Sequence, residues 1–126
     1  MLEQMMKSVL EQDRAAIVMC DCNHVIVYMN PSAIKRYEKR GGADLIGKSL
    51  LNCHNQDSCE KIRKVLDWFS QSPDNNMIYT YYNAKENKDV YMVALRNEQK
   101  ELIGYYEKHE YRDKEKAVPY DFAERK

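Results

Sequence analysis

His54 is the first candidate for a functional side chain in this chain, and it lies just before a predicted helix. The N-terminus of a helix carries partial positive charge, which disfavours imidazolium and keeps a nearby ring neutral. A neutral imidazole binds metal ions well, so His54 is the candidate metal ligand. The alternative is that His54 only caps or hydrogen-bonds its own loop. We expect His24, in a turn, and His109, in the C-terminal tail, to be solvated.

Cysteines suggest a second kind of chemistry. Cys53 and Cys59 flank the start of the same predicted helix, where the helix dipole favours thiolate, so a redox switch at either is one alternative function. Cys20 and Cys22 are separated by a single residue, which does not match the spacing of zinc motifs. We therefore expect no structural zinc. A catalytic thiol needs a base and an orienting group, and no such pattern is present, so we predict no enzyme activity.

Residues 42–49 spell the phosphate-binding expression G-x-x-x-x-G-K-S. Such a loop works between a strand and a helix, whereas here a predicted helix precedes it. Leu45 and Ile46 within it are apolar and suit packing under a turn. The sequence therefore predicts a turn at this position and no nucleotide site.

The elements that must position these residues begin with a helix over residues 1–12. Its apolar side chains recur at helical spacing and form one stripe, made of Leu2, Met5, Met6, Val9 and Leu10. A helix this short is marginal in isolation. The stripe must therefore lie on the body of the protein or on a second copy, and both arrangements fit the pattern.

Two β-runs follow, at residues 15–20 and 25–29, separated by a polar turn. Asn30 is a good N-cap and Pro31 is suited to a first helical turn, so a short helix begins there and should end at Gly41. The spacing of Asp57 and Glu60 predicts a capping box at the start of a second helix.

The remainder is read as three strands, at residues 77–82, 90–95 and 102–106. This order of elements predicts an α+β fold, a five-stranded antiparallel sheet with helices packed on one face. The predicted division is a helix over 1–12, a domain over 13–106 and a charged, solvated tail over 107–126.

Composition limits the classes of partner. The 126 residues include 20 basic and 20 acidic side chains, so there is no basic field to attract nucleic acid. The apolar runs are too short for a membrane span, which argues against a membrane partner. No secretory signal pattern opens the chain, so the cysteines are read as reduced thiols in the cytoplasm.

The order of elements and two short motifs resemble the PAS domain family over residues 13–106. The motifs are Asn30-Pro31-Ser32-Ala33 at the helix entry and Leu45-Ile46-Gly47-Lys48-Ser49-Leu50 at the following turn. Residues 51–54, followed by Ser58 and Lys61, further resemble PAS-like modules attached to hemerythrin-type domains in prokaryotes.

The resemblance implies a sheet that cups a small cavity under the helices and a role as a sensor of a small molecule or cofactor. Haem bound through His54 is the first candidate, because haem-binding PAS domains use a histidine from the helical side. The sheet and its neighbours offer the other candidate cofactor contacts, namely Met29, Met77, Met92, Tyr79 and Tyr91. We expect a homodimer that signals through dimerisation or a separate partner protein. The alternative is a PAS interaction module without a ligand.

Overall fold

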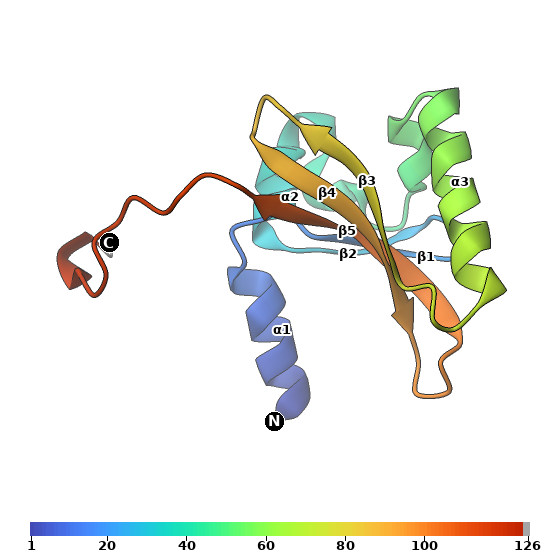
Figure 1. Ribbon diagram of the computed structural model, residues 1–126, viewed down its shortest axis with the longest axis horizontal. Coiled ribbons are helices and arrows are strands. Elements are labelled where there is room, and N and C mark those ends of the chain that lie inside the picture. The colour runs from blue at the N-terminus through green and yellow to red at the C-terminus, as the bar shows by residue number, and fades with distance from the viewer. Residues whose placement is uncertain (125–126) are drawn as a thin grey trace.

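The computed structural model describes residues 1–124, except for the side chains of Cys53 and Glu124. A strongly twisted sheet forms the centre of the molecule, and the helical segments between the second and third strands lie over one of its faces (Figure 1). The N-terminal helix projects away from the sheet. The C-terminal segment continues from the end of the last strand and also extends away from the sheet.

The observed elements follow the predicted order. The α-helices are α1 (Leu2–Gln12), α2 (Pro31–Arg36) and α3 (Gln56–Gln71). The strands are β1 (Val18–Asp21), β2 (Ile26–Met29), β3 (Met77–Asn83), β4 (Lys88–Arg96) and β5 (Leu102–Tyr111). Single turns of 3-10 helix are η1 (Glu38–Arg40), η2 (Gly42–Leu45), η3 (Leu50–Cys53) and η4 (Phe122–Glu124).

All five strands form one sheet in the order β2-β1-β5-β4-β3, and the pairs are antiparallel. The last strand therefore lies in the middle, between the first hairpin and the second. The α+β prediction, with five antiparallel strands and helices on one face, is confirmed.

Asn30 joins three segments that are distant in the sequence. Its side-chain oxygen accepts hydrogen bonds from the backbone N–H groups of Ala33 and Ile17, both at 2.9 Å. Its amide donates to the carbonyls of Leu10, at 3.0 Å, and Ala15, at 2.9 Å. The predicted N-cap is confirmed, and it also ties the end of α1 to the start of β1.

The predicted capping box at Asp57 is wrong by two residues. Asn55 is the N-cap of α3, and its side-chain oxygen accepts a hydrogen bond from the Ser58 N–H at 2.8 Å. Asp57 lies in the first turn instead, where its negative charge still suits the helix dipole. The buried face of α3 consists of Cys59, Ile62, Leu66 and Phe69.

β5 is five residues longer than predicted, because β4 supplies a pairing partner along its whole length. Residues 107–111 therefore continue the sheet, with His109 opposite Val90. The expectation that His109 is solvated in a tail is wrong. His24 is likewise half-buried, and its Nδ1 lies 2.8 Å from the Tyr105 hydroxyl.

α1 leaves most of its apolar stripe uncovered, and only Leu10 of the five residues is partly buried. None of its residues is buried, and Met5 and Val9 are 58% and 70% exposed. The sequence left two arrangements open for this stripe. The structure does not show the stripe packed on the body of the same chain. Across the described residues, no helix combines the length and the hydrophobicity needed to cross a membrane.

Candidate functional site

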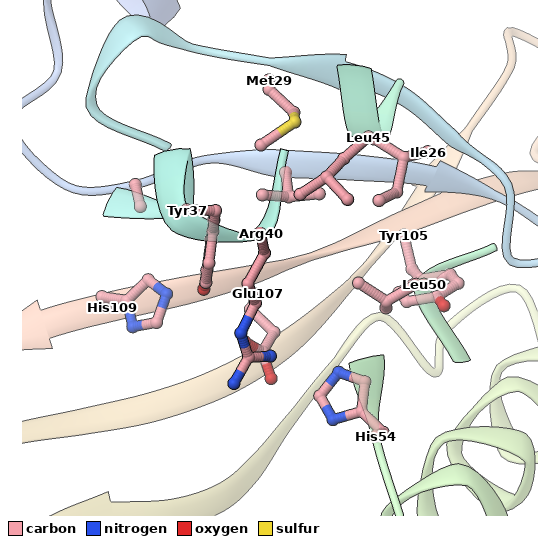
Figure 2. Close-up of a pocket in the computed structure, with 12 residues that line it drawn as sticks. Ile26, Met29, Tyr37, Arg40, Leu45, Leu50, His54, Tyr105, Glu107 and His109 are labelled. Atoms are coloured by element: carbon pink, nitrogen blue, oxygen red, sulfur yellow. The ribbon is translucent and has the colours of Figure 1, made fainter. Parts of the chain in front are cut away.

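A cavity of about 100 Å³ lies between the sheet and the short helices that cover it (Figure 2). Its apolar wall comes from the first hairpin and the 3-10 turns, and consists of Ala16, Val18, Ile26, Met29, Leu45 and Leu50. Its polar groups are Tyr37, Arg40, His54, Tyr105, Glu107 and His109. One space therefore combines an apolar surface with several convergent polar groups.

Three of the polar side chains come from alternate positions of β5. Tyr105, Glu107 and His109 point to the same face because successive strand residues point to opposite faces, and Figure 2 shows them in sequence along the strand. Tyr105 is fully buried, and this burial is the main reason that its pKa lies well above the usual range. Cys20 raises the pKa further. The Tyr105 hydroxyl therefore stays protonated and available for the contact with His24.

Glu107 and His109 form the inner polar end of the cavity. Burial raises the pKa of the Glu107 carboxyl, and the positive charges of Lys88 and Arg36 lower it in part. Burial also lowers the pKa of His109 to about 4, with Lys88 and Arg36 contributing in the same direction. The His109 ring is therefore neutral at pH 7. Its Nδ1 is buried and has no hydrogen-bond partner among the described residues.

An ion-pair network lies behind this polar end. Lys88 is 1% exposed, and its Nζ lies 3.3 Å from Glu86 Oε2 and 5.3 Å from the centre of the Tyr111 ring. Arg36 donates to both Glu86 carboxylate oxygens, at 2.9 and 2.6 Å. These contacts lower the pKa of Glu86 to about 2, with the hydrogen bond from Arg36 as the largest cause. Glu86 therefore stays ionised and compensates the buried Lys88 charge.

Arg40 and His54 lie at the mouth of the cavity, and both are exposed. Partial burial and then the positive charge of Arg40 lower the pKa of His54, which keeps the ring neutral. Arg40 has no ion-pair partner within the described part of the chain. The direction agrees with the neutral ring that the sequence predicted, and its causes are burial and the charge of Arg40.

The structure brings only two of the predicted site residues to the cavity, His54 and Met29. Met92 is buried on the same face of the sheet but packs into the core without lining the cavity. Tyr91 points to the opposite face, because it is the neighbour of Met92 in the strand. Tyr79 pairs with Tyr91 there and is 53% exposed, and Met77 is also exposed. These three are not candidate cofactor contacts.

A porphyrin does not fit this cavity. Pockets that hold cofactors and drug-sized ligands have volumes of roughly 300 to 1,000 Å³, several times the volume present here. His54 also lies at the exposed mouth and not at the centre of an enclosed space. In the described part of the chain, no three His, Cys, Asp or Glu side chains are grouped as a metal site would require.

The other chemical candidates are also placed by the structure. Cys59 is buried, and its thiol donates to the carbonyl of Leu51 at 3.4 Å, so it is not accessible as a redox switch. The side chain of Cys53 lies outside the described residues. Residues 42–49 form η2 and a turn between η1 and η3, which is not the strand-to-helix context of a phosphate-binding loop.

Sequence reasoning missed Tyr37, Arg40, Glu107 and His109. The last two carry no clear signal, because residues 107–110 are all polar and show no alternation of apolar and polar side chains. Tyr37 follows the end of α2 and Arg40 is the last residue of η1, and helical segments so short have no clear apolar face.

Comparisons with known proteins give a consistent result. The family described as PAS domain matches residues 6–108. A search of curated proteins finds no match. Among solved structures, the chain is similar to the PAS domain of a protein from Colwellia psychrerythraea, at 13% identity and a TM-score of 0.64, covering 88% of this chain and 97% of that one.

Two receptor structures are also similar. A sensor histidine kinase structure from Vibrio cholerae has 14% identity and a TM-score of 0.57, with 87% of this chain and 90% of that chain covered. The Aer2 receptor of Vibrio cholerae, described as a dual PAS-heme oxygen sensor, has 17% identity and a TM-score of 0.52, with coverage of 73% and 88%. At these identities the likeness concerns the fold alone.

Proposed function

The chain belongs to the PAS domain family, and we propose that it acts as a sensor whose input is a small organic molecule bound in the cavity between the sheet and the short helices. The observation that carries this proposal is the convergence of Tyr37, Glu107 and His109 on a space that is otherwise apolar. Ligand sites have this composition, with an apolar lining and a few polar groups that fix orientation.

The size of the cavity restricts the ligand. A water molecule occupies about 30 Å³ of liquid, so a cavity of about 100 Å³ holds roughly three waters or a small fragment. Haem ligated by His54 would require the segment from η2 to η3 to move away from the sheet. We therefore propose a small ligand in place of the haem that the sequence suggested.

Ligand binding in the cavity can be tested by measuring the binding of small fragments with ligand-observed NMR. We expect fragments to bind the parent chain and to bind Ala16→Leu at least about tenfold more weakly, because the added isobutyl group fills the cavity. Ala84→Leu is the matched control, since Ala84 is an exposed turn residue. Equal binding to both variants in their folded state would contradict the proposal.

A second copy of the chain is the partner that we propose. The apolar stripe of α1 is exposed although α1 is fixed to the body through the Asn30 bond to Leu10 and the Tyr28 bond to Glu11. A helix held in place with an uncovered apolar face is suited to pack against its own copy. Val9→Glu should therefore produce a monomer by light scattering, whereas Gln4→Glu on the polar side should not. A Val9→Glu chain that stays dimeric would exclude α1 as the interface.

β5 offers a direct route from ligand to partner. It carries Glu107 and His109 on the cavity side and Tyr106 and Lys108 on the opposite face, and it pairs with both β1 and β4. A ligand contact on β5 therefore acts on the strand in the middle of the sheet. We propose that output passes through this strand to a dimer interface or a separate protein, without catalysis by the chain itself.

An interaction module without a ligand is the second candidate, and the outer face of the sheet favours it. Large exposed side chains on this face, or at the edge of the sheet, include Tyr79, Tyr82 and Ile103. Absence of any fragment binding, together with partner binding lost in Tyr79→Ser, would favour this candidate. The cytoplasmic location and the resemblance to modules attached to hemerythrin-type domains stay predictions from the sequence.

A further inference from the structure

Arg40 places a positive charge at the mouth of the cavity that the described part of the chain does not neutralise. It is the last residue of η1, and neither of its acidic neighbours in these turns, Glu38 and Asp44, forms an ion pair with it. Its charge lowers the pKa of His54, and Figure 2 shows the guanidinium extending toward the His54 side of the cavity. Because the His54 ring is neutral, the charge of Arg40 is left for a ligand at the entrance.

The charged groups in and behind the cavity carry an excess of positive charge. Arg40 and Glu107 line it, and the network of Lys88, Arg36 and Glu86 lies behind its inner end. Burial raises the pKa of Glu107, so this carboxyl adds at most one negative charge. The positive groups therefore outnumber the negative ones in either protonation state of Glu107. A ligand with a single negative charge is compensated in both states.

The cavity wall determines where that charge would lie. Complete burial of a carboxylate is costly, so a charged head group is favoured at the solvent-exposed mouth, where Arg40 and His54 are. A guanidinium matches a carboxylate with two parallel N–H···O bonds. The rest of a ligand would enter a space with an apolar wall, made of Ala16, Val18, Ile26, Met29, Leu45 and Leu50.

Resting on the proposed function, we propose that the cavity binds a small monocarboxylate, whose carboxylate pairs with Arg40 at the mouth and whose apolar end packs against Met29 and Leu50. The volume of about 100 Å³ limits the apolar end to a few carbon atoms. Arg40 is then the residue that selects an acid over a neutral molecule of the same size, and the apolar wall supplies affinity for both.

Propionate and propionamide are suitable probes, because they have nearly the same shape and differ in charge. We expect propionate to bind the full chain about fivefold more tightly at low salt, a modest factor because an ion pair with an exposed arginine is weaker than a buried one. The difference should shrink as sodium chloride is added, since salt screens exposed charges. Ligand-observed NMR measures the binding of both probes.

Two neighbouring residues form a matched pair of variants. Arg40→Gln and Lys39→Gln each remove one positive charge from the same turn, and both positions are exposed, so both variants should fold as the parent does. Only Arg40 lines the cavity. We expect Arg40→Gln to bind propionate and propionamide equally, whereas Lys39→Gln should keep the preference of the parent.

The outcomes separate this proposal from the proposed function. Equal or weaker binding of propionate to the parent would overturn the carboxylate site and leave the ligand cavity standing. An equal loss of preference in both variants would also overturn it, because general surface charge would then explain the attraction. Propionate that binds Ala16→Leu as tightly as the parent would lie outside the cavity, which would overturn it as well. No binding of these probes or of any other fragment would overturn both proposals.

Discussion

Acid should destabilise this protein through His109. The folded structure holds the His109 pKa at about 4, below the value of 6.5 for an unperturbed histidine, because the side chain is partly buried and because the positive charges of Lys88 and Arg36 disfavour its protonation. The unfolded chain therefore binds one more proton than the folded chain between these two pH values. Stability rises with pH wherever the unfolded state binds more protons. The contribution is thus present above about pH 6.5 and is lost as the pH falls toward 4.

The magnitude follows from the size of this pKa difference. A change from 6.5 to about 4 corresponds to about 3 kcal/mol, since a tenfold change in proton affinity is worth about 1.4 kcal/mol. The ring is only partly buried, so solvent screening reduces this value. We expect a loss of about 1 to 2 kcal/mol in the free energy of unfolding between pH 7 and pH 4.5.

The assay is urea denaturation at both pH values for the parent and for His109→Gln. Carboxylates also titrate in this range, so the informative quantity is the difference between the two proteins. The variant cannot gain a proton at position 109 and should lose about 1 to 2 kcal/mol less than the parent. An identical loss in both proteins would refute the reasoning, as would an NMR titration that places the His109 pKa near 6.5.

Three further outcomes follow from the structure. Titration with haemin should give the same absorption spectrum for the parent and for His54→Ala, because the cavity has no room for a porphyrin; a Soret band lost only in the variant would contradict this. Glu86→Gln should lower the free energy of unfolding by about 2 kcal/mol, because the buried Lys88 loses its counter-charge, and an unchanged urea midpoint would show that Lys88 is otherwise compensated. Asn30→Ala should cost about 3 kcal/mol in the same assay, since several buried hydrogen bonds are lost together; a cost below about 1 kcal/mol would mean that water replaces them.

The parts of the fold that could be predicted depend on local chemistry. Asn30 followed by Pro31 is a helix start whatever the rest of the chain does, and the apolar spacing of residues 2–10 defines α1 without tertiary information. The order of strands and helices then indicated the sheet. These features need only neighbours along the chain.

The parts that could not be predicted depend on pairing across the sheet. Polar residues at 107–110 look like a solvated tail until β4 is seen to pair with them. Tyr91 and Met92 are both plausible cavity residues, and only the strand register decides which one faces the helices. Burial of His109 is likewise a tertiary effect, so its altered pKa and its unsatisfied nitrogen have no signature in the sequence.

The central claim, that a small molecule binds between the sheet and the short helices, is tested most directly by mapping where fragments bind the full chain. Methyl and amide NMR spectra recorded with a bound fragment should show shifts at the methyl groups of Ile26, Leu45 and Leu50 and at the amides of Glu107 and His109, all at the cavity. Shifts confined to the outer face of the sheet, or spectra that do not change, would contradict the account.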